Sequence, residues 1–525
     1  IVTNLNFEFA FGQHSGVIDS TKDFLELPRF PINEKYGKLK RFKSILQTLP
    51  FPYEKITPEN RYLKKNENPP EIKIKFFENL INVQNINCYS NEGNIWRKSD
   101  IQFINKNELP GYIPVYPSNI NLTYDIPLQF MDDAEIDQLH AMIAAGYLFA
   151  GKLEEALRMS DSALQRSGAA VPQAGWVRGL VQWQLRDYLS AAQAFEVAAN
   201  SPYSTGWMVS AASYWASRAY ARTGNRAQVI KWLDIAASYP RTFYGLIAIR
   251  AQGKNINLNW EMPSLNRDHV KFIESTKAGR RASALIKAGR PDLAQEELQY
   301  LLVGESFAKQ QAMLAYAHEN NLSALSMRLA NSYIRPQGGR YDAALYPVPS
   351  WAPKTGYQID RALIHAIARQ ESKFQSGVKN PSGATGLMQL MPRTASYVAG
   401  NDLGVTQADL AQPDINLELG QRYIQDLLNN ANVGQDLLSL AIAYNAGPGN
   451  LRKWKAERAH IQDPLLFIET IPFHETRAFV ERVLSNYWIY RIRLDQQTPS
   501  LDDVAKGRWA RYISQDHSAA RLAMH

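Results

Sequence analysis

The chain has 525 residues, which is too long for one hydrophobic core, so its length predicts two to four domains. Hydrophobic residues make up 45% of it, and the net charge is +8. A basic chain could bind nucleic acid, but no dense Lys/Arg run or nucleic-acid motif is present, and we expect no nucleic-acid partner. No apolar run is long enough to cross a membrane, and Cys88 is the single cysteine, which excludes an intrachain disulfide.

Residues 1–130 differ in composition from the rest of the chain. They contain one alanine, Ala10, and are rich in Asn, Ile, Lys and Pro, without the pattern of a signal peptide. Two stretches, Glu71–Phe76 and Asn121–Ile126, have alternating or β-branched residues between turn-forming residues. We interpret residues 1–130 as a separate, β-leaning segment without an assigned function.

Residues 131–340 have the pattern of repeated helix pairs. The turn residues Gly151, Asp187 and Gly224 lie 36 and then 37 residues apart between helical segments. This period is close to that of tetratricopeptide-type pairs, which bury their apolar faces only by stacking. Aromatic residues in these helices could bind sugar rings, but their helical spacing favours core packing; they are Trp176, Trp183, Trp207, Tyr214 and Trp215. A proline-rich stretch, residues 335–353, is expected to link this region to the next domain.

The segment that ends at Glu371 has features of an acid catalyst. Residues 361–370 read as a helix with Asp360 as its N-cap. Leu363, Ile367 and Glu371 are four residues apart, so the carboxyl group lies on the apolar stripe, in the last turn. Apolar surroundings and the negative end of the helix dipole both disfavour its ionised form. A Glu that stays protonated near neutral pH can serve as a general acid.

Later segments could complete a site around this acid. The glycine-punctuated segment Gly383–Pro392 could bring Gln389 and Met391 across Glu371. A second segment, residues 437–445, is an apolar helix that ends before a glycine and a proline, which puts Tyr444 in a last turn with its hydroxyl free to reach a pocket.

A third segment, Ile471–Arg477, opens a helix with Glu475 in its first turn, where the helix dipole favours the charged carboxylate. The pKa values of Glu371 and Glu475 are therefore expected to differ. Taken singly, Glu475 would be a capping residue, and Tyr444 would be a core tyrosine.

These segments, in this order, resemble the soluble lytic murein transglycosylases, whose catalytic domain has a goose-type-lysozyme-like fold. The matching strings are Glu371-Ser372, Gly383–Pro392, Ala443–Pro448, Ile471-Pro472 and Glu475–Arg477. The similarity is continuous from about residue 345 to about 495 and extends more loosely back to about 134. It implies a mainly α protein, in which a helical-repeat superhelix (131–340) precedes a lysozyme-like α domain with a small β part (341–498). A polar C-terminal tail, residues 499–525, is expected to pack only partly.

The resemblance implies cleavage of the MurNAc-β-1,4-GlcNAc bond of peptidoglycan without water, which leaves 1,6-anhydromuramyl ends. Glu371 matches the single catalytic residue of the family. The residues expected to contact the glycan are Gln389, Met391, Tyr444, Asn380 and Tyr244. Asn380 stands where the family often has serine. Glu475 and Ser372 are expected to support the site. The implied partners are peptidoglycan strands and cell-wall synthesis enzymes, and the implied location is the periplasm.

The sequence also bears on cofactors and on two alternative functions. No metal-binding, phosphate-binding or dinucleotide-binding motif occurs, so we expect no cofactor and no catalytic metal. One alternative is a goose-lysozyme-type hydrolase, in which Glu475, Asp414 or Glu418 holds a water. Another is an inactive scaffold that binds partners through its helical repeats.

Overall fold

The computed structural model describes residues 132–299, 301, 306–333, 335, 338–400 and 405–516, together with five strands between Tyr53 and Tyr112. The chain divides into two units, Ile1–Asp125 and Ile126–His525. In the first unit, β1 (Tyr53–Thr57), β2 (Glu71–Phe76) and β5 (Glu108–Tyr112) form an antiparallel sheet in the order β1-β2-β5, and β3 (Cys88–Glu92) pairs with β4 (Ile95–Ser99). The predicted strand at Glu71–Phe76 is confirmed, whereas Asn121–Ile126 lies outside the described residues.

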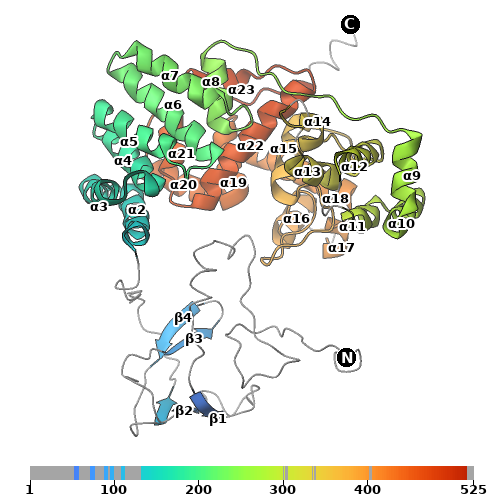
Figure 1. Ribbon diagram of the computed structural model, residues 1–525, viewed down its shortest axis with the longest axis horizontal. Helices are drawn as coiled ribbons and strands as arrows, with labels where there is room; N and C mark the ends of the chain where they lie inside the picture. Colours follow the sequence, from blue (N-terminus) through green and yellow to red (C-terminus); the bar gives the residue numbers. More distant parts are fainter. Residues whose placement is uncertain are drawn as a thin grey trace. The chain divides into compact units, whose positions relative to one another are not determined.

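The second unit begins with three stacked helix pairs, drawn from cyan to green in Figure 1. They are α2 (Asp133–Phe149) with α3 (Leu153–Ser167), α4 (Pro172–Gln184) with α5 (Tyr188–Asn200), and α6 (Gly206–Arg222) with α7 (Arg226–Ala237), and η5 (Gly168–Ala170) follows α3. The turns within the pairs fall where the repeat predicted them, with positive φ at Gly151, Arg186 and Gly224. Trp183 and Trp215 are buried edge to face, 5.1 Å apart, so the preference for core packing is confirmed for them.

Seven further helices lead to the C-terminal domain. They are α8 (Phe243–Ala251), α9 (Arg267–Ser275), α10 (Lys277–Lys287), α11 (Pro291–Gln299), α12 (Phe307–Glu319), α13 (Ser323–Ser332) and the short α14 (Asp342–Leu345). The last of these lies inside the predicted linker. Its Asp342 is buried and accepts hydrogen bonds from Arg241 Nη2 at 2.8 Å and from the Asn259 backbone N–H at 2.7 Å. Asp342 therefore joins the connection to the turn before α8 and to the segment that follows α8.

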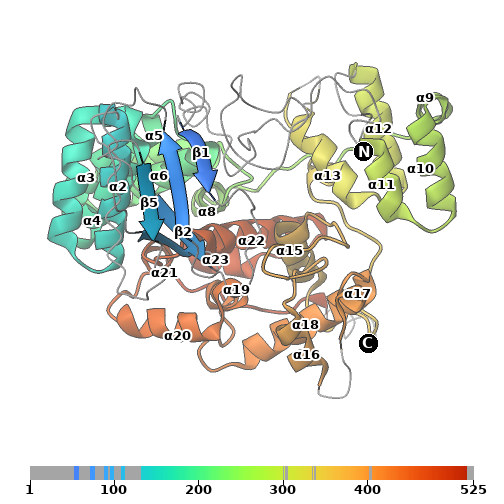
Figure 2. The ribbon, with the colours of Figure 1, turned by 90° about the horizontal axis from the view of Figure 1, so that it is seen from below.

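The C-terminal domain is built around α15 (Arg361–Ser372) and α22 (His474–Arg493), which pack against each other, and α19 (Leu437–Ala446) packs on α22 (Figure 2). Its other helices are α16 (Pro392–Ala399), α17 (Gln407–Leu410), α18 (Pro413–Asn429), α20 (Pro448–Glu457), α21 (Pro464–Glu469) and α23 (Pro499–Ala505). Thr385 forms isolated β-bridges with Lys379 and with Leu390, and these bridges make up the small β part.

The superhelix and the C-terminal domain contact each other, as expected from the short proline-rich connection. The ring of Phe243 in α8 stacks on Trp488 in α22, with centroids 5.3 Å apart. Around this apolar contact, Arg218 of α6 pairs with Asp463 at 2.5 Å, and Arg250 of α8 pairs with Asp502 at 2.8 Å. An apolar stack flanked by ion pairs fixes both the distance and the orientation between the two regions.

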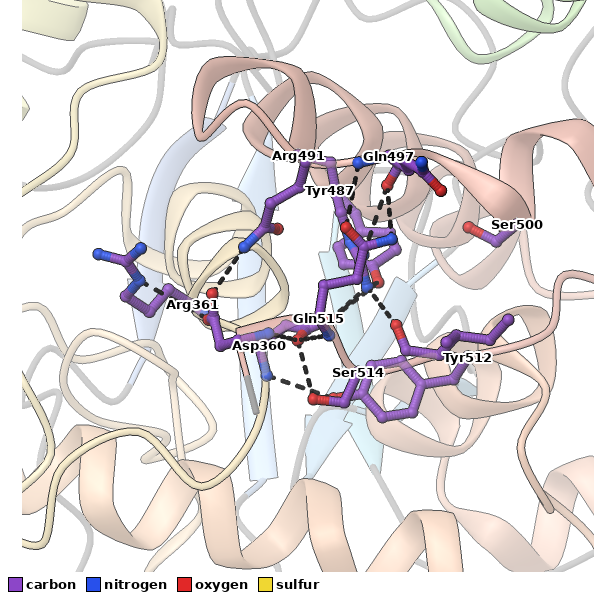
Figure 3. A network of polar contacts seen from close by, with 12 residues as sticks. Asp360, Arg361, Tyr487, Arg491, Gln497, Ser500, Tyr512, Ser514 and Gln515 are labelled. Carbon is purple, nitrogen blue, oxygen red and sulfur yellow. Dashed lines mark hydrogen bonds and ion pairs between the residues drawn. The ribbon is translucent and has the colours of Figure 1, made fainter. Parts of the chain in front are cut away.

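The beginning of α15 differs from the prediction. Asp360 occupies the N-cap position, but its side chain makes no capping hydrogen bond. Its buried carboxylate accepts hydrogen bonds from the Gln515 backbone N–H at 2.8 Å and from Ser514 Oγ at 3.1 Å, and it forms an ion pair with Arg491 (Figure 3). The donors come from a segment some 150 residues further along the chain.

The C-terminal segment is therefore part of this domain. Leu501, Val504 and Ala510 are fully buried, and the Leu437 backbone N–H donates to the Ala510 carbonyl at 2.8 Å. Lys506, Gly507, Arg508, Arg511 and Ile513 are exposed, so residues 499–516 pack in part, as the sequence led us to expect. The part that packs supplies the backbone and hydroxyl donors that the buried Asp360 requires.

Candidate active site

Glu371 lies at the end of α15, just before a sharp reversal of the backbone. Ile367 and Leu363, one and two turns earlier on the same stripe, are each 1% exposed. Lys373 and Phe374, which follow the helix, have φ values of 51° and 63°, a conformation that is unfavourable for non-glycine residues. Ser372 Oγ stabilises the reversal, because it accepts a hydrogen bond from the Phe374 N–H at 3.1 Å and donates to the Ala368 carbonyl at 3.0 Å.

The carboxyl group of Glu371 is half-buried and has no hydrogen bond or ion pair with any residue that the structure describes. Burial raises its pKa from 4.5 to about 8, and the charge of Glu475 contributes in the same direction. The raised pKa predicted from the apolar stripe is confirmed, with burial as its main cause. At neutral pH the group holds a proton that it can donate.

Glycines allow the segment after Asn380 to pack closely against α18. Gly386 has a φ of 85°, and a Cβ atom there would lie 2.1 Å from the Leu410 carbonyl oxygen. A Cβ on Gly420 of α18 would lie 2.1 Å from the sulfur of Met388. Neither position has room for a larger residue, so Gly386 and Gly420 let this segment pack closely on α17 and α18.

Asn416 is a supporting residue that the sequence analysis missed. It is fully buried in α18, and its side-chain oxygen accepts a hydrogen bond from the Met388 N–H at 2.8 Å. Its Nδ2 donates to the carbonyls of Thr385 at 3.0 Å and Leu410 at 2.9 Å. One amide thus satisfies two backbone groups of the loop and the carbonyl at the end of α17. No local pattern marks Asn416, since its partners lie in other segments.

Gln389, on this loop, is held by its own side chain. Its φ is 45°, and Nε2 donates to the carbonyls of Val378 at 3.0 Å and Gly386 at 2.9 Å. Met391, two residues later, is 42% exposed. Asn380 closes the turn before the loop, since its Oδ1 accepts from the Ala384 N–H at 2.9 Å.

Tyr444 joins α19 to the same loop. Its ring is stacked parallel to Phe479, 6.1 Å away, and its hydroxyl donates to the Met388 carbonyl at 2.8 Å. The hydroxyl that was expected to be free is therefore engaged in fixing the loop. Burial raises the pKa of Tyr444 well above 10, and the charge of Glu371 adds to this effect, so the two side chains share one environment.

Glu475 lies in the first turn of α22 with an exposed side chain. The adjacent Thr476 is buried, and its hydroxyl donates to Asn445 Oδ1 at 2.7 Å. This bond connects the start of α22 to the end of α19. It sets the position from which the charge of Glu475 raises the pKa of Glu371.

Tyr244, expected to contact glycan, is not part of this site. It is 1% exposed in α8, and its hydroxyl donates to the buried Glu469 of α21. Burial raises the pKa of both Glu469 and the neighbouring Glu481, each of which also lies close to Arg477. The predicted glycan contact of Tyr244 is wrong, because the residue is enclosed in the contact between the superhelix and the C-terminal domain.

Across residues 132–516, apart from the gaps given above, no three His, Cys, Asp or Glu side chains are grouped so that they could hold a metal ion. None of the helices described is both long enough and apolar enough to span a membrane.

The fold, a helical superhelix followed by a lysozyme-like domain, corresponds to that of known proteins. Residues 350–466 match the family model described as Transglycosylase SLT domain. The X-ray structure of an inactive variant of the lytic transglycosylase Slt from Pseudomonas aeruginosa superposes with a TM-score of 0.57 at 22% identity, over 73% of this chain and 61% of that one. At this identity the superposition supports the fold.

Curated relatives point to the same family. The chain is 27% identical over 397 residues to the soluble lytic murein transglycosylase of Escherichia coli (strain K12), covering 72% of this chain and 58% of that protein. The protein of the same name from Salmonella typhimurium (strain LT2) is 29% identical over 297 residues, covering 55% of this chain and 45% of that protein. The chain thus spans about half the length of these relatives. The resemblance to soluble lytic murein transglycosylases is confirmed, and Glu475 lies beyond the residues matched by the family model.

Proposed function

We propose that the protein is a peptidoglycan lytic transglycosylase that acts in the periplasm on the MurNAc-β-1,4-GlcNAc bond. The observation that carries this proposal is the state of Glu371. Its carboxyl group is unpaired, half-buried and protonated at neutral pH, as its pKa of about 8 requires. The similarity to proteins named as lytic murein transglycosylases supplies the substrate class.

In this mechanism Glu371 acts twice. It first donates its proton to the glycosidic oxygen, and the bond between that oxygen and C1 of the muramyl residue breaks. The C6 hydroxyl of the same sugar then adds to C1 and gives its proton to the Glu371 carboxylate. The product carries a 1,6-anhydro ring, no water is consumed, and the enzyme returns to its initial protonation state.

The residues around Glu371 have distinct roles in this proposal. Gln389 and Met391 line the glycan groove, with the amide of Gln389 held toward the loop so that its Oε1 remains available to the sugar. Asn380 lies at the turn that borders the groove. Tyr444 and Ser372 position the loop and the helix end. Glu475 supports the site by keeping the pKa of Glu371 high.

A goose-lysozyme-type hydrolase is the second candidate, because it would use the same acid. Such an enzyme needs a second carboxylate to hold a water. Glu418, one candidate for that role, is buried and accepts hydrogen bonds from Thr355 Oγ1 at 2.8 Å and Arg422 Nε at 3.0 Å. Its bonding disfavours the hydrolytic role, which leaves Asp414 and Glu475 as the carboxylates such a mechanism could use.

The masses of the products distinguish the two reactions. Purified peptidoglycan is digested with the protein, and the fragments are analysed by mass spectrometry. Lytic cleavage gives fragments with anhydro ends, each lighter by one water than the hydrolytic product and inert to borohydride reduction. Reducing ends throughout would support the hydrolase and reject the proposal, and an unchanged substrate would favour the scaffold reading.

A further inference from the structure

Two arginines hold the turn between α21 and α22 against the superhelix. Arg477, in the first turn of α22, donates a hydrogen bond from Nη1 to the Ile471 carbonyl. Arg458, which follows α20, donates from Nε to the Thr470 carbonyl at 3.1 Å. Both also reach Phe149, the last residue of α2. Arg458 Nη2 donates to its carbonyl at 2.9 Å, and the guanidinium of Arg477 lies 4.6 Å from the centroid of its ring.

A buried pair of glutamates lies close to Arg477. Glu469, at the end of α21, accepts hydrogen bonds from the Tyr244 hydroxyl of α8 and from Glu481 of α22. Burial raises the pKa of both carboxyl groups, and repulsion by Glu469 raises that of Glu481 further, so Glu481 keeps its proton at neutral pH. The charge of Arg477 acts on both glutamates, and that of the exposed Arg482 acts on Glu481. The contact with the superhelix thus continues from α8 to the start of α22.

The first turn of α22 is also bonded to the candidate active site. Thr476 donates to Asn445 Oδ1 at 2.7 Å, which ties this turn to α19. Glu475 comes directly before Thr476 and two residues before Arg477, and its charge raises the pKa of Glu371. The position of Glu475 is therefore set by bonds on either side of the turn.

His474, the residue before Glu475, adds no opposing charge. Burial lowers its pKa, and the charges of Arg477 and Arg482 act in the same direction. The imidazole is therefore neutral at neutral pH and does not offset the negative charge of Glu475.

We propose that Arg477 is a positioning residue for the reaction, which holds Glu475 in place by tying the first turn of α22 to the superhelix. This inference rests on the proposed function, in which Glu475 supports Glu371. The contacts of Arg477 are with Ile471 and Phe149, so it acts through Glu475 and not on the substrate. A guanidinium suits this role because it can donate to a carbonyl while its flat face lies on an aromatic ring.

The first test measures the ionisation of Glu371 without catalysis. The full-length protein carries isotopically labelled glutamate, and the Glu371 carboxyl signal is identified by its loss in Glu371→Gln and titrated by NMR. Arg477→Met removes the hydrogen bond and the charge but keeps a long side chain. It should lower the pKa of Glu371, by at most the shift that Glu475→Gln produces, because Glu475 is no longer held in place. Arg477→Lys keeps the charge and should lie between Arg477→Met and the wild type.

A double variant decides whether Arg477 acts through Glu475. In the Glu475→Gln background, Arg477→Met should produce little further shift, because residues that act in sequence are not additive. An equal shift in both backgrounds, or no shift in Arg477→Met alone, would overturn the inference. An upward shift would do so too, since that is the result of removing a positive charge that acts directly on Glu371.

Arg482→Met is the matched control for Arg477→Met. Arg482 belongs to the same helix, and its charge also acts on Glu481, but it lies five residues beyond Arg477, more than one helical turn away. The variant removes the same charge, so the pKa of Glu371 should equal that of the wild type. Thermal unfolding checks that each variant is folded. Arg477→Met should remain folded, because the two glutamates can bind a further proton when the cation is lost.

The second test measures turnover of purified peptidoglycan. Arg477→Met should lower kcat about tenfold and leave KM within about twofold, because the geometry of the site changes and its contacts with the substrate do not. The alkaline limb of its kcat profile should move to lower pH. Phe149→Ala removes the ring on the superhelix side and should move the limb in the same direction by less.

The two tests separate failure of this inference from failure of the proposed function. Cleavage by the wild type with kcat unchanged in Arg477→Met, or with KM alone altered, would overturn the positioning role and keep the proposed function. The expected titrations without any cleavage by the wild type would reject the proposed function and keep Arg477 as the residue that positions Glu475.

Discussion

The two ends of α15 place a carboxyl group in opposite situations. At its beginning, Asp360 is fully buried, paired with Arg491, and surrounded by donors from Ser514 and Gln515. At its end, Glu371 is half-buried and has no bonded partner in the described part of the chain. The helix dipole favours a negative charge at the first position and disfavours it at the second.

This difference distinguishes a carboxylate that stabilises the fold, Asp360, from a carboxyl group that can transfer a proton, Glu371. A buried charge is tolerated when every oxygen atom is satisfied, and Asp360 meets that condition. Glu371 avoids the same cost by keeping its proton, which is the form that can protonate a substrate. Removal of the Asp360 carboxylate should therefore have different consequences from removal of the Glu371 carboxyl group, and three predictions test this.

The largest effect is expected on activity. Glu371→Gln keeps the size of the side chain but removes the transferable proton, so turnover of peptidoglycan should fall by about 10⁴-fold or more, since each acid–base step contributes roughly 10²–10⁴. Affinity for glycan, measured by calorimetry, should stay nearly unchanged. Glu475→Gln is the comparison variant, and its turnover should fall far less. Near-normal turnover of Glu371→Gln with a dead Glu475→Gln would mean that the acid lies at the start of α22 instead.

The second effect is expected on stability. Asp360→Asn leaves Arg491 buried without its counter-charge, and such a change costs about 3–5 kcal/mol of unfolding free energy. Turnover per folded molecule should stay within a few-fold of the wild type. Asp502→Asn is the matched control, because its partially exposed pair with Arg250 should be worth about 1 kcal/mol or less. Equal urea midpoints for the two variants would contradict the structural role of Asp360.

The smallest effect is expected in the dependence of stability on pH. Because the pKa of Glu371 is about 8 in the folded protein and 4.5 without burial, the native state retains a proton that the unfolded state releases. The stability that the protonated Glu371 side chain contributes is complete below about pH 4.5 and is lost as the pH rises towards 8. Glu371→Gln does not titrate, so relative to the wild type it should gain stability over this interval, by at most about 5 kcal/mol and less where solvent screens the half-buried group.

Unfolding free energies of both proteins between pH 4 and pH 9 check this sign. The other carboxyl groups of the described residues with raised pKa values, Asp436, Glu469 and Glu481, are present in both proteins and cancel in the difference. A difference that stays flat between pH 4.5 and pH 8 would mean that Glu371 ionises normally in the folded protein.

Several features of the site could be predicted from local sequence. The spacing of Leu363, Ile367 and Glu371 predicted the apolar stripe and the raised pKa, because residues four apart share a helix face. The turns of the superhelix followed from the repeat of turn residues such as Gly151 and Gly224. These signals depend only on neighbours within a few residues, so an isolated sequence contains them.

Other features depend on partners that are distant in sequence. The sequence predicted a side-chain cap for Asp360, yet its carboxylate bonds to Ser514 and Gln515. Tyr444 was expected to have a free hydroxyl, which instead holds the Met388 carbonyl. Asn416 has an ordinary helical context, and its importance is visible only when its three backbone partners surround it.

By itself, the sequence determined the helices, the order of the motifs and the position of one acid on an apolar helix face, since helical periodicity is local. The tertiary structure decided which polar groups satisfy one another and which remain unpaired. It enclosed Tyr244 in the contact with α21 and built the C-terminal segment into the domain. It also formed a cavity between α11, α13 and the segment Gln375–Val378. Hydrogen bonds and burial join residues far apart along the chain, so only the folded arrangement could assign them.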